Sequence, residues 1–143
     1  MEHTERKEAK SPNGIVGMLI TDRDAHCVEG VFGALESALQ PLLAGASGVS
    51  AVDLVVSTRA CDARARQAVD RHRPKSVRSM TVLEAVYSAE FRGHHHSEDV
   101  LNAICMQRNA VRQFALDSKL DYAWLFFLDS DIHLNPSTLT LLF

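Results

Sequence analysis

Two aspartates separated by one residue, Asp129 and Asp131, stand directly after the apolar run YAWLFFL (122–128). Carboxylates this close repel each other unless a cation lies between them or water screens them. Mg²⁺ and Mn²⁺ favour oxygen ligands and commonly take one or two carboxylates together with phosphate oxygens. The stretch therefore predicts a divalent-metal site that faces a diphosphate. The alternative is a solvated turn in which Asp129 caps backbone amides.

Polar residues also close two earlier apolar runs, at residues 14–21 and 51–58. These residues are Thr21, Asp22, Arg23, Ser57 and Thr58. Side chains of these types can hydrogen-bond a ligand, but they also serve as turn residues and helix caps. A solvated charge cluster at 22–24 and a simple turn after residue 58 are therefore the alternatives to a binding role.

The order of strand-like and helix-like segments indicates the fold. Expected strands cover 14–21, 51–58, 76–86 and 122–129, and expected helices cover 24–43, 61–73, 97–118 and 135–143. This alternation predicts an α/β fold with a mostly parallel sheet and helices on both faces. Ligands of such sheets bind beyond the carboxyl ends of the strands, where the polar residues above would gather.

Local signals define where the helices begin and end. We expect Asp24 to cap the helix over 24–43, and Pro41 together with the AGASG stretch at 44–48 to end it. We expect Cys105 to lie in the apolar stripe of the helix over 97–118, and thus in the core. Asn135 followed by Pro136 predicts the start of the last helix.

The segment from Tyr122 to Pro136 resembles the Asp-x-Asp segment of GT-A-fold glycosyltransferases: an apolar strand, then LDSD, then a helix that begins near a proline. Arg108 and Asn109, of which Arg108 stands 21 residues before Asp129, resemble a helical Arg-Asn pair of the family-2-like enzymes and the fungal Golgi mannan mannosyltransferases. The resemblance covers about residues 14–143. It implies a three-layer, Rossmann-like fold of the GT-A type.

The resemblance also implies roles for the candidate residues. The protein would be a metal-dependent glycosyltransferase of the hexosyltransferase type, using a nucleotide-diphosphate sugar and Mn²⁺ or Mg²⁺. Asp129 and Asp131 would hold the metal, with Ser130 beside the donor. Arg108 would contact the diphosphate or donor sugar and Asn109 a sugar hydroxyl. Nucleotide contacts would come from Thr21, Asp22, Arg23, Ser57 and Thr58.

Only 12 residues follow Asp131. In GT-A enzymes that half carries the acceptor groove and the catalytic base, so we expect residues 14–143 to form an incomplete donor-binding domain after a disordered tail at 1–13. The acceptor, whether glycan, protein or lipid, has no assignable residues. Two alternatives remain: a haloacid-dehalogenase-like phosphotransferase that uses Asp22 and Asp24, and a non-catalytic nucleotide-binding module.

Composition excludes several classes of protein. The net charge of −3 gives no basic footprint for nucleic acid. No apolar run approaches the roughly 20 residues that span a bilayer. The charged N-terminus lacks the centre of a signal peptide, and three cysteines without CxxC spacing favour a reducing compartment, so we expect a cytoplasmic protein. His94–His96 stand adjacent in an expected loop, without metal-ligand spacing.

Overall fold

A computed structural model describes residues 12–45, 47–85 and 98–143. The elements, in chain order, are β1 (Asn13–Leu19), η1 (Asp22–Cys27), α1 (Val28–Ala44), β2 (Ala51–Arg59), α2 (Ala63–Arg71), β3 (Met80–Ala85), α3 (Glu98–Asp117), β4 (Tyr122–Phe127) and α4 (Thr138–Leu142). Residues 1–11 of the tail predicted at 1–13, the histidines at 94–96, and Ser97, the first residue of the expected helix over 97–118, lie outside the described residues. Asn13, which we expected in the tail, is instead the first residue of β1.

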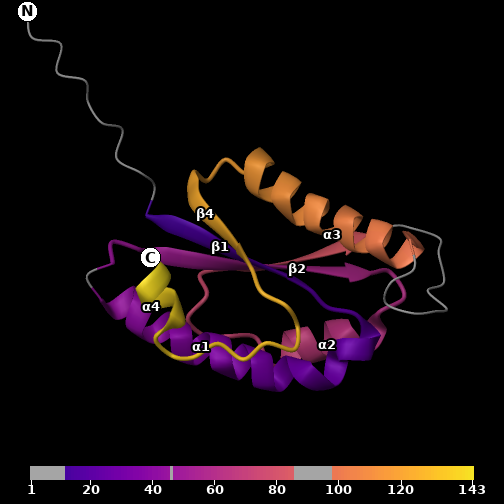
Figure 1. The fold of residues 1–143 in the computed structure, drawn as a ribbon, viewed down its shortest axis with the longest axis horizontal. Helices are drawn as coiled ribbons and strands as arrows, with labels where there is room; N and C mark the ends of the chain where they lie inside the picture. The colour runs from indigo at the N-terminus through magenta and orange to yellow at the C-terminus, as the bar shows by residue number, and fades with distance from the viewer. Residues whose placement is uncertain (1–11, 46, 86–97) are drawn as a thin grey trace, which may run out of the picture.

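The four strands form one parallel sheet in the order β3-β2-β1-β4. Helix α3 covers one face, while α1, α2 and α4 lie on the other (Figure 1). This arrangement confirms the predicted α/β fold with a parallel sheet and helices on both faces, and it is compatible with a Rossmann-like fold. Among the described helices, none is both long and apolar enough to cross a bilayer.

The core has two parts because the sheet is buried on both faces. The larger cluster lies between the sheet and α1, and it includes Val16, Phe32 and Leu54. The smaller one, built on Ile15, Val55 and Val111, lies under α3. β1 is buried along most of its length, as expected of a central parallel strand.

Gly17 sets the distance between α3 and the sheet. A Cβ built on Gly17 would lie 2.8 Å from Cγ1 of Val111, closer than carbon atoms pack. Glycine at this position therefore allows α3 to lie directly on β1.

A buried carboxylate links the strands near their amino-terminal ends. Asp53 on β2 is 1% exposed and accepts hydrogen bonds from Arg78 Nε (3.1 Å) and Nη2 (2.6 Å), and from the Tyr122 hydroxyl (2.5 Å). Burial by itself raises the pKa of Asp53. Hydrogen bonds from Arg78, Tyr122 and Ser79 and the charge of Arg78 outweigh that effect, so the pKa lies below its ordinary value. Because Tyr122 is the first residue of β4, this cluster ties β4 to β2 across β1.

Helix α1 ends at Ala44, one residue beyond the expected end at 43, and it continues through Pro41 because Leu42 is fully buried and its packing stabilises this turn. The expected start of the last helix is wrong. Helix α4 begins at Thr138 rather than at Asn135. The Asn135 side chain accepts hydrogen bonds from the Ser137 amide (3.0 Å) and hydroxyl (2.8 Å), which forms a turn in place of a helix start.

The expected helix cap at Asp24 and the expected burial of Cys105 are also wrong. Asp24 does not begin a helix: Thr21 is the N-cap of the short 3-10 helix η1, and Asp24 lies at its third position. Cys105 is exposed rather than in the core. Helix α3 instead buries Ala103, Gln107 and Val111, which recur every four residues along one side.

We predict that Tyr122→Phe lowers the free energy of unfolding by about 1.5–3 kcal/mol, the usual range for a hydrogen bond to a charged group. The variant keeps the ring that packs against the smaller core cluster and removes the donor to Asp53. Urea unfolding at pH 7 measures the difference. A variant as stable as the wild type would contradict the role of Asp53 in holding β4.

We further predict that this difference depends on pH. Because the folded-state pKa of Asp53 lies below its ordinary value of 3.8, its ionised form stabilises the fold above that pH. The contribution is lost as the pH falls through the folded-state pKa. The gap between wild type and Tyr122→Phe should therefore shrink between pH 6 and pH 2.5, as measured by urea unfolding at each pH. A constant gap would show that the charge of Asp53 plays no part.

Candidate functional site

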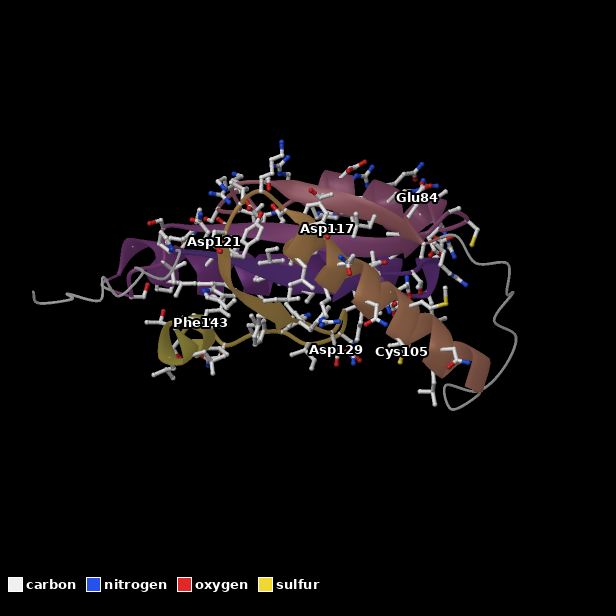
Figure 2. All side chains as sticks on the ribbon, turned by 90° about the horizontal axis from the view of Figure 1, so that it is seen from above. Glu84, Cys105, Asp117, Asp121, Asp129 and Phe143 are labelled. Atoms are coloured by element: carbon white, nitrogen blue, oxygen red, sulfur yellow. The ribbon has the colours of Figure 1, made fainter. Side chains whose placement is uncertain are left out.

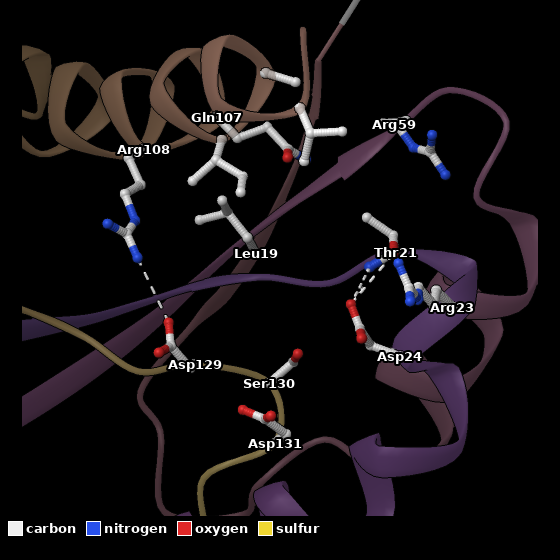
Figure 3. A pocket seen from close by; sticks show the side chains of 13 residues that line it. Leu19, Thr21, Arg23, Asp24, Arg59, Gln107, Arg108, Asp129, Ser130 and Asp131 are labelled. Atoms are coloured by element: carbon white, nitrogen blue, oxygen red, sulfur yellow. Dashed lines mark hydrogen bonds and ion pairs between the residues drawn. The ribbon is translucent and has the colours of Figure 1, made fainter. Parts of the chain in front are cut away.

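A pocket of about 430 Å³ opens at the carboxyl ends of β1, β2 and β4, with α3 along one side (Figure 3). Its lining residues are Leu19, Thr21, Arg23, Asp24, Arg59, Val100, Ala103, Ile104, Gln107, Arg108, Asp129, Ser130 and Asp131. The sheet order places this pocket where chain connections leave in opposite directions, between β1 and β4. In open parallel sheets this switch point is the usual position of a ligand.

The loop after β4 contributes the two acids and the serine between them. Asp129 Oδ1 lies 3.5 Å from Arg108 Nη2 on α3, and the Arg108 guanidinium lies 5.9 Å from the centre of the Phe127 ring. Both charged side chains are well exposed, at 50% for Arg108 and 62% for Asp129. An exposed pair of this kind contributes little to stability, so a ligand can replace either partner at small cost.

The loop after β1 contributes Thr21, Arg23 and Asp24 from the opposite side (Figure 3). Asp24 Oδ2 accepts hydrogen bonds from the Thr21 amide (3.4 Å) and hydroxyl (3.2 Å). These bonds close the first turn of η1 and fix the direction in which the chain leaves β1. The pocket therefore has one rigid wall from η1 and one wall from the loop that carries the acids.

Asp62 joins the loops that follow β1 and β2. Its carboxylate is fully buried and accepts hydrogen bonds from the Asp22 amide (3.1 Å), from the Arg59 amide (2.8 Å), and from Arg59 Nε (3.0 Å) and Nη2 (2.9 Å). Burial raises the pKa of Asp62, but these bonds and the charge of Arg59 outweigh it, so the pKa lies below its ordinary value. Asp62 thereby holds Arg59 at the edge of the pocket.

The structure brings six of the predicted site residues together in this pocket. They are Thr21, Arg23, Arg108, Asp129, Ser130 and Asp131.

Four predicted residues do not line the pocket. The Asp22 carboxylate accepts a hydrogen bond from the Ala65 amide (2.8 Å) and lies 4.0 Å from Arg64 Nε, so it faces the start of α2. Ser57 and Thr58 are fully buried in the sheet. Asn109 is exposed and does not line the pocket, because its position on α3 is turned about 100° from that of Arg108.

The glycosyltransferase interpretation did not assign Asp24, Arg59 or Gln107 to the site. Arg59 is placed by Asp62, which stands three residues later on the next loop. Gln107 is 3% exposed, and it lies between Ala103 and Val111 on the buried side of α3. The sequence signal for Gln107 was the spacing of Ala103 and Val111. A residue midway between two buried positions eight residues apart lies on the same helix face.

The described residues hold no group of three or more His, Cys, Asp or Glu side chains that could bind a metal alone. Asp129 and Asp131 could supply two oxygen ligands, and the remainder would have to come from a bound ligand and from water. His133 does not line this pocket. Its ring lies against Gly30 of α1, where an added Cβ would be 2.9 Å from its Nε2 atom.

Comparisons of the chain with protein-family models, with curated proteins and with solved structures found no match.

We predict that Asp62→Asn lowers the free energy of unfolding by about 2–4 kcal/mol, because it removes the buried charge that accepts hydrogen bonds from Arg59 and from two backbone amides. Asp70→Asn, on the exposed side of α2, is the matched control and should change stability by less than about 0.5 kcal/mol. Urea unfolding of the three proteins measures both effects. Equal stabilities for the two variants would contradict a structural role for Asp62.

Proposed function

We propose that this pocket binds a nucleotide-diphosphate sugar together with Mn²⁺ or Mg²⁺, and that the chain is the donor-binding domain of a glycosyltransferase with a GT-A-type fold. One observation carries the proposal. Two carboxylates from the end of β4 and a guanidinium from α3 face the same pocket at the switch point of a parallel sheet. This supports the resemblance of the LDSD segment and of Arg108 to that family.

The charges of the pocket suit a metal-bound diphosphate. Arg108 can bind phosphate oxygens, because its planar guanidinium donates two parallel hydrogen bonds. Asp129 and Asp131 would hold the metal, whose other ligands would be diphosphate oxygens and water. When bound, the metal supplies Lewis-acid stabilisation of the charge that forms on the departing nucleoside diphosphate.

The ion pair between Arg108 and Asp129 would open when the ligand binds. Arg108 would then turn from Asp129 to the diphosphate, and the carboxylate would become available to the cation. Both side chains are exposed enough to move without disturbing the core. The phosphotransferase alternative receives no support from the geometry, because the Asp22 carboxylate faces α2 and Asp24 is engaged by Thr21.

We predict that a nucleotide sugar and Mn²⁺ together stabilise the protein against heat. UDP-glucose and GDP-mannose are suitable probes, each tested with Mn²⁺ and with EDTA. A ligand that binds only the folded state adds about 2.7 kcal/mol at a hundredfold excess over its Kd. Differential scanning fluorimetry should therefore show a rise in Tm that requires the metal.

Asp129→Ala and Asp131→Ala should each abolish the metal-dependent rise in Tm. The matched control is Asp121→Ala, because Asp121 is an exposed acid that precedes β4 at the other end of the strand (Figure 2). That control should keep the full response. No response of the wild type to any nucleotide sugar, or an unchanged response of both variants, would overturn the proposal.

A further inference from the structure

Gln107 is a polar side chain in a position where the fold requires burial. It is 3% exposed, and its Nε2 atom has no hydrogen-bond partner within the described part of the chain. Its neighbours one turn away on the same face, Ala103 and Val111, are buried and apolar. A buried amide without a partner destabilises a fold, so leucine or methionine would suit packing better. Stability therefore does not explain why this position holds a glutamine.

The surroundings of Gln107 differ from those of the acids. The pocket wall near it is apolar, formed by Leu19, Val100, Ala103 and Ile104. In Figure 3 the side chain of Gln107 extends from α3 to the side of the pocket where Arg59 lies, and Arg108 and Asp129 lie on the other side. The pocket thus has one end with Arg108 and the acids, and another end where an apolar wall and the Gln107 amide lie on the same side as Arg59.

These two parts match the two ends of a nucleotide. A diphosphate requires cations and donors, which Arg108 and a metal at Asp129 would supply. A nucleobase is flat and apolar on its faces, and its edge carries hydrogen-bond donors and acceptors. A primary amide presents one donor and one acceptor side by side, and pairs with such an edge through two hydrogen bonds.

We infer that Gln107 is a specificity-determining residue that recognises the edge of the nucleobase, which lies between the apolar wall of α3 and Leu19. The inference rests on the proposed function and adds the contact that selects the base. A rotation of the Gln107 side chain brings Nε2, which is buried and has no partner among the described residues, to a ring or carbonyl acceptor of the base. The diphosphate then extends toward Arg108 and Asp129.

Isothermal titration calorimetry tests this with five probes, each with Mn²⁺: UDP, GDP, ADP, CDP and pyrophosphate, which has no base. We expect the wild type to bind one of the nucleotides more tightly than the others and than pyrophosphate. Gln107→Leu should weaken binding of that nucleotide by about 10- to 100-fold. It should leave the affinity for pyrophosphate within about twofold. Gln113→Leu, an exposed glutamine on the same helix, should leave every affinity unchanged.

The Tm of the ligand-free variants separates recognition from a structural role. Leucine satisfies the apolar wall, so Gln107→Leu should match or exceed the Tm of the wild type. Gln107→Met, a second apolar side chain of similar length, should behave in the same way. A lower Tm or loss of folding in both variants would show that the amide serves the fold, and would overturn the inference.

The binding data also distinguish failure of the proposed function from failure of the role of Gln107. Unchanged affinities in Gln107→Leu, or equal losses for nucleotide and pyrophosphate, would overturn the role of Gln107 and leave the proposed function standing. If the wild type binds neither a nucleoside diphosphate nor pyrophosphate with Mn²⁺, the proposed function and the inference both fail.

Discussion

The pocket depends on the way the chain leaves the central strand of a parallel sheet. After β1 the chain crosses one face through α1 to β2, whereas the connection from β3 to β4 crosses the other face through α3 (Figure 1). Both strands adjacent to β1 run parallel to it, so the carboxyl ends of the three strands lie together, with α3 along one side. Gly17 completes the arrangement, because the absence of a side chain lets α3 approach β1 and form the side of the pocket. A change that moved α3 outward would therefore alter the site as well as the core.

The acidic residues divide into two groups with different physical settings. Asp53 and Asp62 are buried, and each is hydrogen-bonded to an arginine that stands nearby in space, which keeps its pKa low. Their charges are neutralised within the fold, so they serve its stability. Asp129 and Asp131 lie at an open pocket, and Asp129 has one arginine at 3.5 Å. That arginine is exposed, so part of the negative charge of Asp129 and Asp131 is available to a ligand, and this difference separates the acids that stabilise the fold from those that we assign to binding.

The sequence predicted the strands, three of which are short apolar runs followed by polar residues, and it predicted their parallel direction from the alternation of strands and helices. It also predicted that residues at the ends of β1 and β4 would meet, which requires only the direction of the strands. It could not predict that Asp22 faces α2, since that depends on a contact with Ala65, 43 residues later. The buried side of α3 was misjudged at Leu101 and Cys105 for a similar reason. Leu101 and Cys105 are more apolar than Gln107, but the position of α3 over Gly17 selects the face that carries Val111.

Polar atoms that are buried without partners gather near the pocket rather than throughout the fold. Within the described residues they are Ser57 Oγ, Thr58 Oγ1 and Gln107 Nε2. Ser57 pairs in register with Leu19, which lines the pocket, and Thr58 follows it at the end of β2. At the other end of the sheet the buried charge of Asp53 is fully engaged by Arg78 and Tyr122. A fold optimised for stability alone would satisfy or remove such groups at both ends. Among the described residues, these unpartnered groups lie near the carboxyl ends of the strands. This is expected if that end of the sheet binds a ligand, since local departures from good packing concentrate at functional sites.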